Sequence, residues 1–281
     1  MHPVLLDLGR VKLHTYGLMI AIGFLVALFF IRRDARRRLG IEPDVVNAIG
    51  FWILITGVLG ARLLHILLYP HDYSLTDPVG WVALWRGGLV FQGALPAALA
   101  YYYVAMRRKN LSFWAGLDVA LPYLPLAHAF GRVGCFMYGC CYGRPTDLPW
   151  GIRFPEGSPA WNEGLHAMDA ACTHALHPTQ LYSVFGLLAI CGLLLLARRA
   201  WRRFDGIAAP AYLFLYGVGR FIVEFFRGDN NPRHIGGLVL SDQQVIALGM
   251  ALFGAALFVV LWRYAPSSVL EADAARKDAK S

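Results

Sequence analysis

Largely apolar segments of about 18 residues or more recur along the chain and alternate with shorter polar segments. A segment of this length, folded as a helix, is sufficient to cross the roughly 30 Å hydrocarbon core of a bilayer. The pattern therefore predicts an all-α polytopic membrane protein with seven transmembrane helices. Their expected ranges are 15–31, 45–68, 87–106, 113–135, 179–197, 208–226 and 242–262.

The polar segments between the predicted spans differ in length and character. Segment 138–178 is the longest and is rich in proline, so we expect an outer loop or small extracytoplasmic cap. Segment 73–86 carries two tryptophans, and such amphipathic aromatic residues favour the membrane interface. Residues 266–281 are small and polar, which predicts a disordered cytoplasmic tail. The expected organisation is one membrane domain, 1–265, followed by this tail.

Composition and charge agree with a membrane protein. Of the 281 residues, 57% are hydrophobic and 16% are charged, whereas about a quarter are charged in an average soluble domain. Mean hydropathy is +0.49. A net charge of +8 would also suit a nucleic-acid-binding protein, but the basic residues gather between predicted spans, in 32–38, 107–109 and 198–203. This is the positive-inside pattern of cytoplasmic loops, so we expect no nucleic-acid partner.

The distribution of basic residues also predicts an orientation. Assigning each lysine and arginine to a side of the membrane gives sixteen inside, seven outside, and three in or at the edge of a span. The excess inside places the N-terminus outside and the C-terminus in the cytoplasm.

Two arginines that follow glycines are the first candidates for chemistry. Arg132 and Arg220 fall near the outer ends of predicted outward-going spans, where an unpaired charge is costly. Each could instead bond freed backbone carbonyls or an acid, and Glu224 lies one helical turn beyond Arg220 on the same face. Because guanidinium groups make forked contacts with phosphate, the pair favours an anion site. Both arginines are expected to face one cavity.

Three further polar residues in apolar surroundings are candidates. Arg62 suits a structural role and an anion-binding role equally well. Gln92 would need a partner in lipid. Asp118 is costly inside a span unless it is paired or hydrogen-bonded.

The five cysteines form no zinc-ribbon or C-x-x-C pattern, and their odd number excludes complete pairing in intramolecular disulfides. Cys135, Cys140 and Cys141 are interpreted as small buried hydrophobic residues. The vicinal Cys140 and Cys141 could alternatively be redox-active in an oxidising compartment. Metal binding would need further ligands such as His128 or His177, which the spacing does not demand. We therefore expect no metal and no other cofactor.

Five blocks of sequence resemble the signature of bacterial prolipoprotein diacylglyceryl transferases. They are residues 14–19 (HTYGLM), 87–93 (GGLVFQG), 131–143 (GRVGCFMYGCCYG), 177–182 (HPTQLY) and 216–227 (YGVGRFIVEFFR). The blocks occur in the family's order and are spread over most of the chain, from residue 14 to residue 227, and together they are highly specific.

The resemblance implies a multi-pass enzyme of the bacterial plasma (inner) membrane. Such an enzyme transfers the diacylglyceryl group of phosphatidylglycerol to the lipobox cysteine thiol of a prolipoprotein, forming a thioether and releasing glycerol 1-phosphate. The implied partners are phosphatidylglycerol, prolipoprotein lipobox segments and the lipid bilayer. No metal is needed if cations hold the phosphate.

The resemblance also implies roles for individual residues. Arg132 and Arg220 are assigned to headgroup binding and leaving-group stabilisation, with Glu224 orienting Arg220. The other residues expected at the reacting centre or in contact with substrate are Tyr16, Gln92, Gly131, Gly134, Cys135, Cys140, Gly143, His177, Tyr182, Tyr216 and Arg62.

The chain departs from the family's common pattern at three of these positions. Cys135 stands where the family often has Asn, and Cys140 where an acid is frequent. Gln92 stands where the family often has His or Tyr, either of which would be a candidate for accepting the thiol proton. Because Gln cannot act as a general base at neutral pH, the proton acceptor is left open among a neighbouring tyrosine, the lipid–water interface and cysteine chemistry.

Three other functions are compatible with the sequence. A non-catalytic anionic-lipid-binding or transport protein would use the same arginines without chemistry, although no internal repeat relates the two halves. A membrane thiol-redox protein would depend on Cys140 and Cys141. A divergent member of the family would have a changed donor or acceptor.

Overall fold

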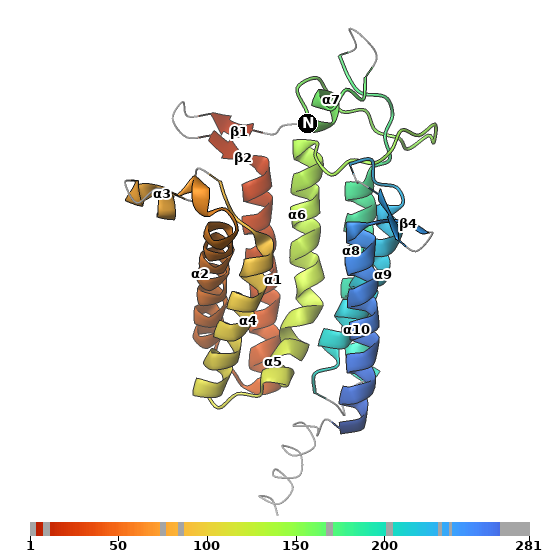
Figure 1. Ribbon diagram of the computed structural model, residues 1–281. Helices are drawn as coiled ribbons and strands as arrows, with labels where there is room; N and C mark the ends of the chain where they lie inside the picture. Colours follow the sequence, from red (N-terminus) through yellow and green to blue (C-terminus); the bar gives the residue numbers. More distant parts are fainter. Residues whose placement is uncertain are drawn as a thin grey trace, which may run out of the picture. The chain divides into compact units, whose positions relative to one another are not determined.

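The computed structural model describes residues 4–7, 12–73, 77–83, 87–166, 171–200, 205–229, 232–235 and 238–264. Most of these residues are helical, and Figure 1 shows the order of the elements along the chain. The elements are β1 Val4–Asp7, β2 Lys12–His14, α1 Thr15–Leu39, α2 Pro43–Leu68, η1 Pro70–Asp72, α3 Pro78–Val82, α4 Phe91–Arg108, α5 Phe113–Ala120, η3 Leu121–Tyr123, α6 Leu124–Tyr138, α7 Pro159–Asn162, α8 Thr179–Ala200, α9 Ala208–Glu224, β3 Pro232–Ile235, β4 Leu238–Ser241 and α10 Asp242–Tyr264.

Every predicted span corresponds to a helix or to a pair of consecutive helices, so the expectation of a helical protein is confirmed, and the structure is compatible with a polytopic membrane protein. Helices α8 and α10 begin at the predicted residues, and α1 continues to Leu39 through the first basic cluster. Four helical stretches are long and apolar enough to cross a membrane, and they are Thr15–Leu39, Pro43–Leu68, Thr179–Arg198 and Asp242–Leu261.

Two predicted spans were wrong in detail. Helix α4 begins at Phe91 rather than at Gly87, because Gly87 and Gly88 have φ angles of +82° and +78°, which a right-handed helix does not allow. The predicted span 113–135 consists of α5 and α6 with the 3₁₀ turn η3 between them. Pro125 lies in the first turn of α6, where the missing N–H costs little.

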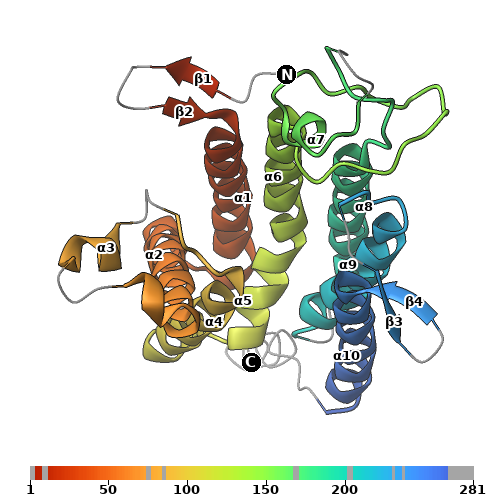
Figure 2. The same ribbon diagram turned by 45° about the horizontal axis from the view of Figure 1, so that its top comes forward.

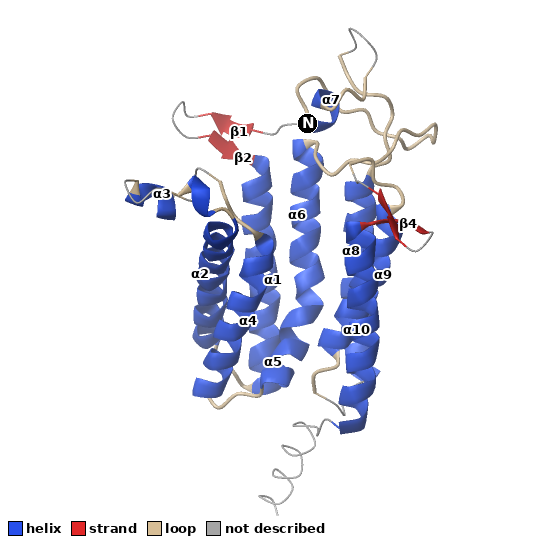
Figure 3. Ribbon diagram, in the orientation of Figure 1, coloured by secondary structure: helices blue, strands red, loops and turns tan. Residues whose placement is uncertain are grey.

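Two short antiparallel hairpins, absent from the all-α prediction, flank membrane-length helices (Figure 3). Strands β1 and β2 lead into α1. Strands β3 and β4 pair Pro232 with Ser241 and Ile235 with Leu238, and β4 leads directly into α10. The predicted tail 266–281 lies outside the described residues.

The described chain divides into two compact units. The first takes the described residues up to Phe30 and those from Leu117 onward, and the second is Ile31–Gly116. In the first unit α8 packs on both α6 and α9, and α9 packs on α10, as Figures 1 and 2 show. In the second unit the main packing is between α2 and α4.

Glycines permit the closest helix crossings in each unit. In the first unit a Cβ at Gly23 of α1 would lie 2.7 Å from the carbonyl oxygen of Ala127 in α6, and Gly217 of α9 lies similarly close to α10. In the second unit, Gly60 of α2 and Gly93 of α4 meet backbone to backbone. Small residues at such crossings let helices gain dispersion contacts that apolar lipid cannot replace.

Asp118 shows how one polar residue in an apolar segment is accommodated. Its two carboxylate oxygens accept hydrogen bonds from the backbone N–H groups of Gly206 and Ala208, at 2.6 and 2.8 Å. The carboxylate therefore caps the start of α9 from another helix, which satisfies otherwise unpaired backbone donors. The expectation that Asp118 is hydrogen-bonded is confirmed.

The described part of the predicted outer segment 138–178 has a small core of its own. Tyr142, Phe154, Ala160 and Leu176 are buried against one another. Leu176 also pairs with Ile152 through two backbone hydrogen bonds of 2.9 Å. The segment is therefore a folded cap with a single short helix, α7, among its described residues.

The packing at Gly217 yields a stability prediction. In Gly217→Ala the new methyl group would lie 2.6 Å from the carbonyl oxygen of Ala247 and 2.8 Å from the backbone nitrogen of Ala251. We expect overpacking to lower the free energy of unfolding by about 1–3 kcal/mol, measured by thermal unfolding in detergent. The matched control is Gly249→Ala in α10, where a Cβ meets nothing within 4 Å and helix propensity favours alanine. Equal stability of the two variants would contradict a close α9–α10 crossing.

Candidate active site

Arg132 and Arg220 line one cavity, as predicted. The cavity has a volume of about 40 Å³ and is formed by α6, α8 and α9 of the first unit. Its lining residues are His128, Arg132, Tyr182, Ser183, Gly186, Leu187, Ile190, Tyr216, Gly219, Arg220 and Val223. Two guanidinium groups from different helices therefore meet at a small, mostly apolar hollow.

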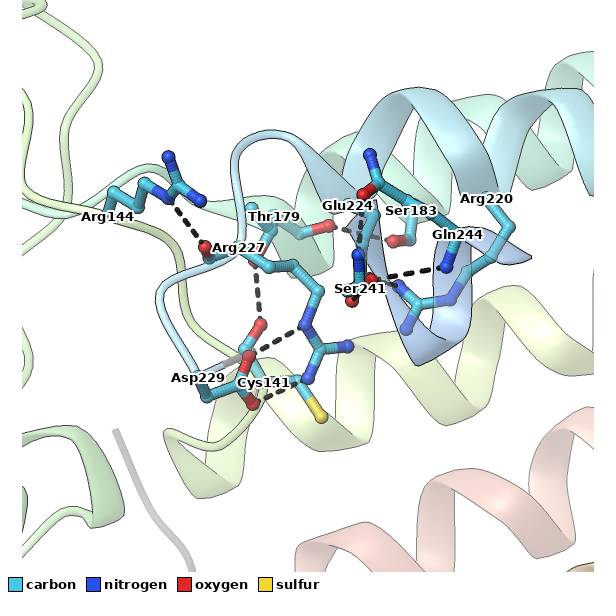
Figure 4. A network of polar contacts seen from close by, with 10 residues as sticks. All are labelled: Cys141, Arg144, Thr179, Ser183, Arg220, Glu224, Arg227, Asp229, Ser241 and Gln244. Atoms are coloured by element: carbon cyan, nitrogen blue, oxygen red, sulfur yellow. Dashed lines mark hydrogen bonds and ion pairs between the residues drawn. The ribbon is translucent and has the colours of Figure 1, made fainter. Parts of the chain in front are cut away.

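Arg220 is held by a buried acid. Its Nη1 lies 2.8 Å from Oε2 of Glu224, and the side chain of Glu224 is only 1% exposed. The spacing of four residues on α9 places the two groups on the same helix face. The predicted partnership of Glu224 with Arg220 is therefore present as an ion pair, drawn in Figure 4.

Glu224 is itself held by the start of α10. The hydroxyl of Ser241 donates a 2.9 Å hydrogen bond to Oε1 of Glu224. The same hydroxyl accepts from the backbone N–H of Gln244 at 3.1 Å, while the Ser241 N–H donates to the Gln244 side chain at 2.9 Å. This reciprocal pair is a capping box at the N-terminus of α10. This capping box therefore fixes the position of Glu224, which in turn holds Arg220 (Figure 4).

Arg132 is in a different electrostatic position. Within the described residues it has neither a hydrogen bond nor an ion pair, whereas Arg220 is paired with Glu224. The preceding residue, Gly131, has open space where a side chain would lie. Arg132 thus brings an uncompensated positive charge to the cavity, and such a charge in an apolar bundle favours an anion.

Aromatic residues complete the cavity wall. The ring of Tyr216 lies 5.5 Å from that of His128 and 5.7 Å from that of Tyr212. The hydroxyl of Tyr182 is 2.8 Å from the indole nitrogen of Trp150 and 3.1 Å from Nδ1 of His177. Tyr182 therefore links the cavity to the cap formed by segment 138–178.

The predicted glycines fall into two kinds. Gly134 packs on α1, since a Cβ there would lie 3.1 Å from Cδ2 of Tyr16. Gly143 lies between His177 and Phe226, with its N–H donating to the His177 carbonyl at 3.0 Å. Both positions need glycine for close packing, while Gly131 alone leaves open space.

Three segments far apart in the sequence join beside the cavity. The N–H of Arg144 donates to the Phe226 carbonyl at 2.9 Å, and the Arg144 carbonyl accepts from the His177 N–H at 3.0 Å. Arg227 forms a forked pair with Asp229, at 2.7 and 2.5 Å (Figure 4). Burial alone would lower the pKa of Arg227, but the hydrogen bond and charge of Asp229 raise it overall.

The structure brings Cys135, Cys140 and Cys141 together. Their sulfur atoms all lie within 4.8 Å of one another, and all three are free thiols. Hydrogen bonds from the Cys135 and Cys140 thiols, with the charges of Arg227 and Arg132, lower the pKa of Cys141. Among the described residues this is the group whose ligand atoms are close enough to hold a metal ion.

Two predicted site residues belong to the second unit. Arg62 donates to the carbonyls of Gly80, Trp81, Gly87 and Gly88, which favours its structural role. It lines a separate polar cavity of about 260 Å³ in that unit. Gln92 is exposed near the start of α4. The roles assigned to both residues in substrate binding and catalysis stay predictions.

Ser183, Ser241 and Gln244 are polar residues of this site that were not predicted from the sequence. Ser241 and Gln244 hold Glu224, and the S-x-x-Q spacing before an apolar helix was a signal that could have revealed them. Ser183 lines the cavity, and its hydroxyl donates to the Thr179 carbonyl at 2.8 Å. Its position four residues after Thr179 gave no indication of a cavity.

The structure shows a helical protein with four helices long and apolar enough to cross a membrane and with a cavity lined by two arginines. Comparison with known proteins narrows this class. Residues 3–260 match the family described as prolipoprotein diacylglyceryl transferase. The chain is 36% identical over 260 residues to a phosphatidylglycerol–prolipoprotein diacylglyceryl transferase of Clostridium tetani, covering 92% of this chain and 97% of that protein. A protein of the same name from Geobacter sulfurreducens is 35% identical over 263 residues, with coverages of 93% and 95%. The chain belongs to the prolipoprotein diacylglyceryl transferase family.

The buried pair of Arg220 and Glu224 generates a prediction about stability. Glu224→Gln leaves the guanidinium without its counter-charge in a largely buried position, so we expect a loss of about 3–5 kcal/mol in the free energy of unfolding. The comparison variant is Asp229→Asn, which breaks a pair whose acid is 25% exposed and should lose about 1 kcal/mol or less. Denaturation in detergent measures both, and similar losses would argue against a buried counter-charge role for Glu224.

Proposed function

We propose that this transferase moves the diacylglyceryl group of phosphatidylglycerol to the cysteine thiol of a prolipoprotein lipobox segment, releasing glycerol 1-phosphate. Family membership and the names of the relatives support the reaction class. The observation that carries the proposal is one cavity lined by two arginines. Arg132 has no counter-charge among the described residues, whereas Arg220 is paired with Glu224. This arrangement suits a reaction that increases the negative charge on a phosphate.

The proposed reaction is a displacement at an sp³ carbon. The acceptor thiolate attacks the glycerol carbon that carries the phosphate ester, a carbon–sulfur bond forms and the carbon–oxygen bond breaks. The electron pair of that bond leaves on the phosphate, which changes from a singly charged diester to a more highly charged monoester. Groups that stabilise the added charge in the transition state therefore accelerate the step.

The two arginines would divide this task. Arg132 offers a net positive charge, because no carboxylate pairs with it among the described residues. Arg220 is neutralised in part by Glu224 and held in place through Ser241, so it offers directed donors more than net charge. Tyr216 lines the same cavity, and Tyr16 contacts Gly134 one helical turn from Gly131, which supports their assignment to the reacting centre.

We further propose that the chain crosses the bacterial plasma membrane seven times, with the N-terminus outside and the C-terminus in the cytoplasm. Four helices have the length and hydropathy of membrane spans. Helices α4 and α9 and the α5–α6 pair coincide with the remaining apolar segments. The surplus of basic residues on one side supports the orientation.

Substitution of Arg132 tests the proposed function. We expect Arg132→Ala to lower transfer by about 10²–10³-fold without unfolding the protein, because one charge-stabilising donor is lost. Arg132→Lys should rescue poorly, since lysine lacks the guanidinium fork. The assay supplies phosphatidylglycerol and a synthetic lipobox peptide, and mass spectrometry detects the diacylglyceryl mass on the cysteine.

The matched control for this experiment is Arg153→Ala. Arg153 is an exposed arginine of the outer cap, outside the cavity lining, so its loss should leave transfer nearly unchanged. Full activity of both Arg132→Ala and Arg220→Ala would place the reaction elsewhere in the molecule.

Gln92 provides a separate prediction. Because a carboxamide cannot accept the thiol proton at neutral pH, Gln92→Ala should retain appreciable turnover in the same assay. Complete loss of transfer from a folded Gln92→Ala protein would show that this residue contributes more than the departure from His or Tyr suggests.

A further inference from the structure

The three-thiol cluster of Cys135, Cys140 and Cys141 lies outside the lining of the arginine cavity and has no role in the displacement as described so far. Its sulfur atoms lie within 4.8 Å of one another. Cys135 is buried and the other two thiols are half-buried. Three free thiols at this separation are close enough together to hold one metal ion.

The end of α6 builds the first two members of the cluster. Gly139 follows the helix in the left-handed conformation, with φ of +83°. The Cys140 N–H donates to the Cys135 carbonyl at 3.2 Å, and the Gly139 N–H donates to the Phe136 carbonyl at 3.2 Å. These two bonds define a Schellman motif, in which the side chains at the positions of Cys135 and Cys140 meet.

Helix α8 fixes the position of the third member. Cys141 also has a positive φ, +61°, which a non-glycine residue adopts only when its surroundings impose it. The buried side chains of Thr179 and Gln180 provide that constraint. Thr179 Oγ1 donates to the Cys141 carbonyl at 2.7 Å, and Gln180 Nε2 donates to the Cys140 carbonyl at 2.8 Å. The backbone that carries the thiols is therefore held from both sides before any ligand binds.

The spacing of the thiols suits one thiophilic metal ion. A zinc–sulfur bond is about 2.3 Å long, so two sulfurs of a tetrahedral site lie about 3.8 Å apart, within the bound set by the cluster. Three protein ligands leave a fourth position open, which is the arrangement of catalytic rather than structural zinc. A thiol that enters the fourth position loses its proton on coordination.

The cluster is also adjacent to the proposed leaving-group site. Cys135 lies three residues after Arg132 on α6, so the two side chains are neighbours on the helix surface. A nucleophile held at the cluster would thus stand one helical turn from the arginine assigned to the departing phosphate.

We propose that Cys135, Cys140 and Cys141 bind one zinc ion, and that the acceptor cysteine of the prolipoprotein becomes its fourth ligand. The second part of this inference rests on the proposed function. The coordinated thiol releases its proton to water, and its sulfur lone pair then attacks the glycerol carbon. The carbon–oxygen bond breaks, its electron pair leaves with glycerol phosphate, and the neutral thioether dissociates from the metal. The zinc ion takes the place of the general base that Gln92 cannot supply.

Metal binding is tested first, independently of activity. Protein purified without a polyhistidine tag should contain about one zinc ion per chain, measured by inductively coupled plasma mass spectrometry. After chelation, Co²⁺ should restore the site and produce thiolate-to-cobalt charge-transfer absorption. Both signals should disappear in a Cys140→Ser/Cys141→Ser variant that keeps its thermal unfolding midpoint. The control is Cys172→Ser, which removes a half-buried thiol of the outer cap outside the cluster.

The fourth position is tested with the acceptor. A lipobox peptide should change the cobalt spectrum of the wild-type protein, while the same peptide with Ser in place of Cys should not. In the transfer assay, the double variant should be about thirtyfold slower at pH 7, because a free thiol with a pKa of about 8.5 is only about 3% ionised there. Its rate should approach that of the wild type near pH 9, whereas the Cys172→Ser control keeps the wild-type pH profile.

The outcomes separate this inference from the proposed function. Purified protein without zinc that also gives no Co²⁺ signal would overturn the zinc site. Full-rate transfer by metal-free wild-type protein would overturn the role of zinc in the reaction. Either result would leave the proposed function standing. A disulfide within the cluster, seen as two thiols of the cluster that react with a thiol reagent only after reduction, would also overturn the zinc site. If the peptide thiol changes the cobalt spectrum but is never modified by the metal-loaded protein, the result would support the metal site and contradict the proposed function.

Discussion

The arrangement of the first unit depends on how an apolar helical bundle accommodates charge. Arg220 is tolerated because Glu224, on the same helix, supplies an opposite charge that is almost completely buried. That acid is in turn bonded by Ser241, whose own position is fixed by the capping box at the start of α10. Gly217 lets α9 approach α10 closely enough for this contact. The ion pair, the capping box of α10 and the crossing of α9 with α10 therefore depend on one another. Arg132 takes no part in this network, and its charge has no partner among the described residues.

Hydrogen bonds of the backbone link the cap formed by segment 138–178 to the long helices. Backbone hydrogen bonds join Gly143 and Arg144 to His177 and Phe226, so the ends of α6, α8 and α9 meet at one junction. The side chains of Thr179 and Gln180 add hydrogen bonds to the carbonyls of Cys141 and Cys140. Segments that carry the candidate chemistry are thus held by bonds that also satisfy the termini of the helices, which keeps buried backbone groups paired.

A displacement at an sp³ carbon needs an activated sulfur on one side and a stabilised phosphate on the other. Helix α6 carries candidates for both within one turn, with Arg132 preceding Cys135 by three residues. Three residues further along this helix the chain presents a thiol, and two more thiols follow in the loop after the helix. The end of this helix therefore brings a set of soft sulfur atoms close to the arginine that we assign to the phosphate.

The sequence by itself determined the helical architecture, the two arginines and the partnership of Glu224 with Arg220, because hydropathy period and i, i+4 spacing are local properties. It also placed the starts of α8 and α10 correctly. Only the tertiary structure decided that Arg62 bonds to four backbone carbonyls and that Ser241 reaches Glu224 from another helix. It alone showed that the thiols of Cys135, Cys140 and Cys141 lie close together. The left-handed conformation of Gly139 ends α6, and Thr179 of α8 holds the following loop through the Cys141 carbonyl. Such contacts depend on how distant segments meet, which residue spacing along one chain does not encode.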